Sequence, residues 1–265
     1  MAGAPLDVQV RGSGPRVVLV HGSVLGVRTW QHQDALAGSY TLVLANRPGF
    51  GASPPLARGD FEAEAPLFAD LLDDGAHLVG HSYGAVIALY AAAIAPDRVR
   101  SLTVSEPGCL AVSAGNRDVD AQIAGGELLY AQAEHLEAID FLRAFRGGAG
   151  STHHTPDELD GELLAGAELL RRERPPWEAT PDWERLAAAP FPKLAISGGH
   201  SPVFEAVCDA VAERIGAERA VIPGRGHSVP AAGEPYNERL RAFLGTVEGA
   251  ARARPVRQGG ASSYH

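Results

Sequence analysis

The sequence has few cysteines, a single lysine and no long apolar run. Its two cysteines, Cys109 and Cys208, are too few for a disulfide framework and are expected to be reduced core thiols. The net charge of −9 at pH 7 argues against general binding to nucleic acid. No uncharged apolar stretch reaches the roughly 18 residues of a membrane span, and the opening MAGAPLDVQV does not resemble a secretory signal. These absences predict a cytoplasmic protein with no nucleic-acid or membrane partner.

Short runs rich in branched apolar residues recur along the chain, each followed by a turn and a helical pattern. Such runs indicate strands buried on both faces, and their alternation with helices predicts an α/β fold with a doubly wound, mostly parallel sheet. The expected strands are 16–20, 41–45, 76–80, 99–105, 193–197 and 219–223, and the expected helices lie near 29–38, 62–73, 83–95, 204–216 and 235–247. Residues 6–12 are expected to add an edge strand, joined in a hairpin to the next strand through Gly12–Pro15.

The alternation stops between Ser105 and Lys193, where the sequence contains only helix-like stretches. This interval predicts a helical cap inserted between two strands and folded over the sheet. We therefore expect a core formed by residues 1–106 and 191–249, a cap formed by 107–190, and a disordered tail at 250–265 that lacks periodicity. The cap contains the pair His153-His154, but no third ligand stands at metal-binding spacing, so no metal site is expected.

The stretch Gly80-His81-Ser82-Tyr83-Gly84 places a serine between an expected strand and an expected helix. Its spacing matches the G-x-S-x-G nucleophile elbow, a tight turn that strains the serine backbone and leaves no room for larger side chains at the two glycines. The helix that follows directs its N-terminal amides at the serine, which favours developing negative charge. Ser82 is therefore the expected nucleophile.

Around this serine the chain resembles the α/β-hydrolase family, over roughly residues 6–248. His21-Gly22-Ser23 ends a strand as the family's His-Gly oxyanion loop does. Asn46–Gly51, closed by Ser53, resembles the family's D-x-x-G-x-G-x-S turn with Asn in place of Asp. Gly224–His227 resembles the family's histidine loop. The resemblance implies the α/β-hydrolase fold.

His227 is the expected general base among ten histidines. It follows a strand in a glycine-flanked loop and preserves the chain order Ser…acid…His. Ser82, Glu106 and His227 all lie near the carboxyl ends of expected strands, which share one edge of a parallel sheet, so these distant residues can meet. His81 neighbours the serine, but its side chain is expected to point away.

The catalytic acid is the less regular part of the expected triad. The resemblance implies an aspartate after the strand 193–197, but that position holds Ser201, which carries no charge. Glu106 ends the preceding strand in VSEPG, and some α/β-hydrolases carry their acid after this strand, so Glu106 is the expected acid. Glu205 and Asp209 remain alternatives, as does a site without an acid.

The oxyanion hole is expected from the backbone N–H groups of Tyr83 and of Ser23 or Val24. We expect an apolar pocket above it, formed by loop residues and by aromatic residues of the cap. Its candidate lining residues are His21, Val24, Leu25, Tyr83, Phe141, Phe145, Trp177, Trp183 and His200.

A serine nucleophile with a base and an oxyanion hole indicates acyl transfer. The expected function is a serine hydrolase that cleaves a small, fairly apolar carboxylic ester, thioester or lactone through an acyl-enzyme, without cofactor or metal, as a monomer or homodimer. The same scaffold could serve as a carbon–carbon bond hydrolase, a biosynthetic cyclase or transacylase, or a non-catalytic ligand-binding homologue.

Overall fold

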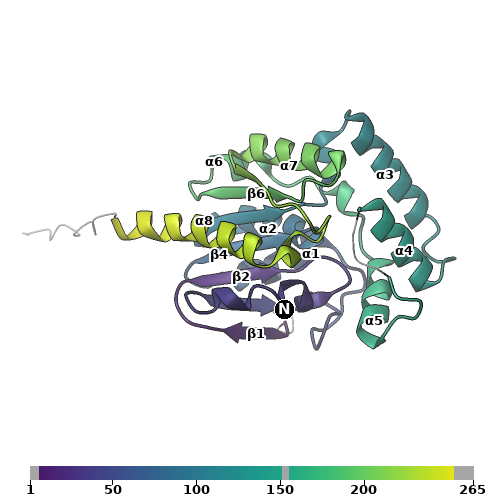
Figure 1. Ribbon diagram of the computed structural model, residues 1–265, viewed down its shortest axis with the longest axis horizontal. Coiled ribbons are helices and arrows are strands. Elements are labelled where there is room, and N and C mark those ends of the chain that lie inside the picture. The colour runs from purple at the N-terminus through teal and green to yellow at the C-terminus, as the bar shows by residue number, and fades with distance from the viewer. Residues whose placement is uncertain (1–5, 151–154, 254–265) are drawn as a thin grey trace, which may run out of the picture.

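The computed structural model describes residues 6–150 and 155–253, and within them one seven-stranded sheet forms the centre of the molecule (Figure 1). The strands are β1 (Val8–Arg11), β2 (Arg16–Val20), β3 (Thr41–Ala45), β4 (Ala76–His81), β5 (Val99–Ser105), β6 (Lys193–Ser197) and β7 (Glu218–Val221). Their spatial order is β1-β3-β2-β4-β5-β6-β7, and every neighbouring pair is parallel except β1 with β3. This sheet confirms the predicted doubly wound α/β architecture.

Helices cover both faces of the sheet, which explains why its central strands are apolar throughout. Successive residues of a strand point to opposite faces of the sheet and pack against different helices. Val18 belongs to the core beneath α1 (Phe61–Asp70), α2 (Tyr83–Ile94) and α7 (Pro202–Ile215). Leu19 belongs to the core beneath α8 (Glu234–Ala253). β4 is buried along its whole length. Within the described residues, no helix is both long enough and apolar enough to cross a membrane.

The chain between β5 and β6 forms helices in place of strands. These are α3 (Arg117–Tyr130), α4 (Ala138–Gly148), α5 (Gly161–Leu170) and α6 (Trp183–Ala188). Figure 1 shows α3, α4 and α5 side by side beyond one end of the sheet. They share a small core of their own that includes Phe141 and Leu170 and also takes in Val24 from the loop after β2.

Several short 3-10 turns complete the described elements. They are η1 (Gly26–Trp30), η2 (Asp34–Leu36), η3 (Pro96–Arg98), η4 (Leu110–Ser113), η5 (Pro176–Glu178) and η6 (Val229–Ala232). The continuous helix expected near 29–38 is therefore wrong, because η1 and η2 occupy this interval. Between these turns, the buried Gln33 donates hydrogen bonds to the Pro230 carbonyl and to Asn237, which connects the segment to η6 and α8.

The edge strand exists, but its predicted hairpin partner is wrong. β1 pairs antiparallel with β3, which lies between β1 and β2. The connecting loop crosses closely over the chain before β3, since a Cβ at Gly12 would lie 2.2 Å from the Ala37 carbonyl oxygen and one at Gly14 would lie 2.4 Å from that of Ser39. Glycines in the left-handed region allow this crossing.

The disordered tail was predicted to begin at residue 250, which is too early, because α8 continues through Ala253. Residues 254–265 of that prediction lie outside the described residues, as does the His153-His154 pair.

Candidate active site

Ser82 occupies the sharp turn between β4 and α2. Its φ is +55°, a strained conformation for a residue with a side chain. Both flanking glycines are required sterically. A Cβ at Gly80 would lie 2.5 Å from the Gly84 carbonyl oxygen, and a Cβ at Gly84 would lie 2.3 Å from the carbonyl oxygens of Val20 and His21. The turn therefore has the geometry that the G-x-S-x-G spacing predicts.

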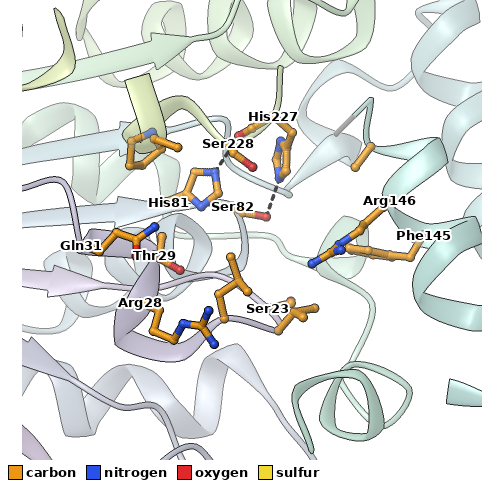
Figure 2. A pocket seen from close by; sticks show the side chains of 15 residues that line it. Ser23, Arg28, Thr29, Gln31, His81, Ser82, Phe145, Arg146, His227 and Ser228 are labelled. Carbon is orange, nitrogen blue, oxygen red and sulfur yellow. Dashed lines mark hydrogen bonds between the residues drawn. The ribbon is translucent and has the colours of Figure 1, made fainter. Parts of the chain in front are cut away.

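A chain of hydrogen bonds links Ser82, His227 and Glu106. The Ser82 Oγ lies 2.9 Å from His227 Nε2 (Figure 2), and His227 Nδ1 lies 2.6 Å from Glu106 Oε2. These residues come from the ends of β4 and β5 and from the loop after β7, so the sheet brings together side chains as far as 145 residues apart. Among the expected acids, Glu106 is the one that the structure places against His227.

The Glu106 carboxylate is held by the backbone around it. Its φ is +43°, and its N–H donates to the Ile196 carbonyl at 2.9 Å. Its Oε1 accepts a 2.6 Å hydrogen bond from the N–H of Gly198. A Cβ at Gly198 would lie 2.4 Å from the Gly226 carbonyl oxygen, so a glycine is needed where this loop meets the histidine loop. One carboxylate oxygen of Glu106 therefore accepts a backbone hydrogen bond, and the other faces His227.

Burial shifts the protonation of both members of this pair. It raises the pKa of Glu106 to about 7, although the Gly198 N–H and the nearby His200 oppose that rise. Burial lowers the pKa of His227 to about 3. A neutral His227 can donate its Nδ1–H to Glu106 while Nε2 accepts the Ser82 hydroxyl proton, which is the arrangement that a general base requires.

The remaining acid candidates lie elsewhere. Glu205 accepts a hydrogen bond from the Gly199 N–H and pairs with Arg219 at 2.9 Å, and Asp209 pairs with the same arginine at 2.7 Å. Ser201 caps no backbone group and simply precedes α7. The carboxylates of Glu205 and Asp209 therefore pair with Arg219 rather than with His227.

The loop after β2 forms the other wall of the site. Val24 has a φ of +80°, and a Cβ at Gly22 would lie 3.0 Å from the Cβ of Ser82, which places the loop directly beside Ser82. From the other side, α5 presents Gly166, where a Cβ would lie 2.0 Å from the Val24 carbonyl oxygen. The loop therefore lies where the expected oxyanion donors, the backbone N–H groups of Ser23 or Val24 and of Tyr83 at the start of α2, would be needed.

A buried ionic network supports this loop, and no sequence pattern signalled it. Arg47 pairs with Glu64 at 2.8 Å and with Glu173 at 2.8 Å, and all three side chains are at most 2% exposed. The Ser23 hydroxyl donates to the other oxygen of Glu173. Arg47 also donates to the Gly22 carbonyl at 3.3 Å. The network joins the oxyanion loop to α1 and to the segment after α5.

Three of the side chains expected to line the pocket lie elsewhere. His21 is fully buried, accepts the Arg47 N–H at Nε2 and donates from Nδ1 to the Gly22 carbonyl, and burial lowers its pKa to about 3. The centroid of the Tyr83 ring lies 4.2 Å from the Arg47 guanidinium carbon. Trp183 of α6 lies apart from this network, half-buried against the main core and with its ring centroid 5.9 Å from the Arg214 guanidinium carbon. The expectation that these three side chains line the pocket was wrong: His21 and Tyr83 are buried in the interior, and Trp183 is not among the lining residues of the cavities at Ser82.

The two histidines beside the triad also differ from expectation. His81 lines the site rather than pointing away, and its Nε2–H donates to the His227 carbonyl at 2.8 Å (Figure 2). His200 lies behind the site: its Nδ1 is 3.3 Å from Glu106 Oε1, and its ring stacks on Phe204, which stacks in turn on His227. His200 therefore contacts the acid and is absent from the lining of the cavities at Ser82.

Two cavities meet at Ser82 and His227. An apolar cavity of about 240 Å³ lies under the cap, where Trp177, Phe145 and Leu110 are among its walls. A second cavity of about 90 Å³ lies on the side of the loop after β2, where Val24 and Leu25 form part of the lining. We call it the polar cavity because its walls also include Arg28, Gln31 and Arg146. Phe141, expected in the pocket, is instead buried in the core of the cap.

The chain was compared with known proteins. A model described as the Alpha/beta hydrolase family matches residues 17–239. The dihydrolipoyllysine-residue acetyltransferase component of the acetoin cleaving system of Pseudomonas putida is 31% identical over 246 residues, which cover 87% of this chain but less than two thirds, 64%, of that relative. A pimeloyl-(acyl-carrier protein) methyl ester esterase of Methylococcus capsulatus is 37% identical over 180 residues, covering 63% of this chain and 71% of the relative.

A solved structure gives the same result at the level of the fold. The bromoperoxidase of Bacillus anthracis has a TM-score of 0.70 to this chain at 23% identity, over 91% of this chain and 96% of its own. The elbow, the sheet order and the family match together show that the chain belongs to the alpha/beta hydrolase family.

Proposed function

We propose that this protein is a serine hydrolase that cleaves a small, fairly apolar carboxylic ester, thioester or lactone through an acyl-enzyme on Ser82. The observation that carries the proposal is the hydrogen-bonded chain from Ser82 through His227 to Glu106, which opens into a cavity with mostly apolar walls. The similarity to a relative named as a methyl ester esterase supports an ester as the substrate class.

The proposed reaction has two halves. Ser82 Oγ attacks the carbonyl carbon as His227 Nε2 takes the hydroxyl proton, and the backbone N–H groups of Tyr83 and of Ser23 or Val24 stabilise the oxyanion. His227 then gives its proton to the departing alcohol or thiol, which leaves the acyl group on Ser82. A water molecule attacks this acyl group as His227 accepts its proton, and the carboxylic acid departs while Ser82 regains its hydrogen.

The test is hydrolysis of para-nitrophenyl acetate and butyrate by the wild type and by Ser82→Ala, Glu106→Gln and Ser201→Ala. Ser82→Ala should abolish turnover, and Glu106→Gln should lower kcat by about 10²–10⁴-fold, because a glutamine favours the wrong His227 tautomer. Ser201→Ala is the matched control and should retain wild-type activity.

Labelling by a serine-directed phosphonate, located by peptide mass spectrometry, gives a readout that does not depend on the substrate. Stoichiometric labelling of the wild type at Ser82 is expected. Appreciable ester turnover by Ser82→Ala would refute the mechanism, and a wild type that neither turns over esters nor takes the label would indicate a non-catalytic binding protein.

A further inference from the structure

The polar cavity differs in charge from the rest of the protein. Arg28 and Arg146 line it together with uncharged polar groups such as Thr29 and Gln31, and no carboxylate is among its described lining residues. The chain as a whole carries a net charge of −9. A cationic wall next to the nucleophile of an acidic protein therefore provides local attraction for an anion that the overall charge would repel.

Arg146 is the better placed of these two arginines. It extends from α4, and Figure 2 shows its guanidinium directed into the polar cavity on the side of Ser82. Its contacts include a 3.2 Å hydrogen bond to the Thr155 hydroxyl, and burial lowers its pKa. Arg28 is more exposed and pairs with Glu162 at 3.1 Å. Arg146 is thus partly buried in a cavity that Ser82 also lines, where hydrogen bonding to an anion is strong.

The two cavities differ in what they can hold. The apolar cavity includes Trp177, Phe204 and Leu110 in its lining, with Gln122 as its polar side chain apart from Ser82 and His227. Because Ser82 and His227 line both cavities, a substrate whose carbonyl lies at Ser82 extends one way into apolar walls and the other way toward Arg146.

We propose that the substrate is an amphiphilic ester or thioester, with an apolar group on one side of the scissile carbonyl and an anionic group, a carboxylate or phosphate, on the other side, where Arg146 binds it. This inference rests on the proposed function and narrows its substrate class. Arg146 acts here as a specificity residue that selects the anion and positions the carbonyl over Ser82.

The test compares esters that differ in charge but little in shape. In one pair the leaving group carries the anion: para-carboxyphenyl butyrate against para-carbamoylphenyl butyrate. In the other pair the acyl group carries it: the monoethyl ester of adipic acid against the matching ester amide. The measured quantity is the preference, the ratio of kcat/KM for the anionic to the neutral member of a pair.

The wild type should prefer the anionic member of one pair, and that pair identifies the side of the substrate that faces Arg146. Arg146→Gln should reduce this preference by about 10–100-fold, which corresponds to the loss of a charge-assisted hydrogen bond. Arg146→Lys should retain part of the preference, because the charge remains without the planar fork. Arg98→Gln is the matched control and should keep the full preference, because it removes an exposed arginine of η3 that pairs with Asp70 of α1.

A wild type without preference in either pair, or an Arg146→Gln variant that keeps the preference, would overturn the inference. If the wild type turns over none of the esters, calorimetric binding of the products decides instead. Para-hydroxybenzoate or adipate should then bind more tightly than its amide, and equal binding would overturn the inference. Phosphonate labelling of Ser82 reports on the proposed function separately, so a labelled enzyme without charge preference would exclude this inference alone.

Discussion

Glu106 combines a strained backbone conformation with a buried side chain, as functional residues often do. It has a positive φ, a fully buried side chain and a pKa raised to about 7. Below that pH the carboxyl is protonated and no longer holds the negative charge that orients His227 and stabilises its protonated form. The activity of this protein should therefore depend on pH near neutrality.

We expect kcat/KM for para-nitrophenyl butyrate to fall about tenfold per unit as the pH decreases below about 7. His200→Gln should move this acidic limb to higher pH, because the ring beside Glu106 lowers the pKa of its carboxyl. A pH–rate profile of both proteins, with Ser201→Ala as control, measures the shift. A limb that stays in place in His200→Gln would show that this ring has no influence on the acid.

The stability of Glu106→Gln gives an independent check on the same pKa. A folded-state pKa raised from 4.5 to about 7 means that ionisation costs stability progressively as the pH rises through this interval. Glutamine avoids that cost, so the variant should be at least as stable as the wild type at pH 8, measured by urea unfolding. A clearly less stable variant would mean that lost hydrogen bonds outweigh the removed charge.

At the scale of elements, α5 acts on the oxyanion loop through close packing. Gly166 lies in the middle of α5 and meets the Val24 carbonyl so closely that no larger residue fits without a shift. Val24 itself has a positive φ, so its backbone orientation depends on such contacts. The cap therefore contributes to the site by holding a backbone segment, beyond covering the cavity.

Gly166→Ala should lower kcat and reduce the free energy of unfolding by about 1–3 kcal/mol, because the added methyl group displaces Val24. Gly161→Ala is the matched control in the same helix, since a Cβ there meets no atom within 4 Å. Steady-state kinetics and urea unfolding of the two variants measure these effects. Equal kinetics in both variants would show that the position of Val24 does not matter for turnover.

Periodicity in the sequence predicted most elements because a sheet covered on both faces demands apolar strands. It did not predict the partner of β1, since residues 6–12 carry no signal for which strand lies beside them, and a short loop favours the simpler hairpin. It also missed that 29–38 forms two 3-10 turns, because the contacts that hold Gln33 come from residues about two hundred positions away.

At the scale of the whole molecule, the sequence predicted the candidate site only in part. Ser82, Glu106 and His227 could be proposed from the sequence because each lies at a strand end next to a recognisable turn. The pocket side chains could not, because orientation depends on tertiary packing: Tyr83 and His21 turn toward Arg47, and His81 turns into the site.

The network around Glu173 joins the cap to the core, and it had no signal in the sequence. Glu173 stands in the run RRERPP, which resembles a solvated charged segment, yet its side chain is buried against Arg47 and against Ser23, a residue 150 positions earlier. An isolated parallel β-bridge between Gly59 and Glu173 also holds this segment through backbone hydrogen bonding. These contacts predict that cap and core unfold together.

Glu173→Ala tests this coupling. Removing a buried partner should lower the free energy of unfolding by about 3 kcal/mol, and it should lower kcat because Ser23 loses the acceptor that holds the oxyanion loop. Glu173→Gln keeps an acceptor oxygen and should lose less of both. Glu178→Ala removes a half-exposed carboxylate paired with Arg174 nearby and should change stability by less than about 1 kcal/mol. Hydrogen exchange should quicken in Glu173→Ala at residues 22–25 and in α5 together, whereas faster exchange confined to α5 would show that the cap is not what holds the loop.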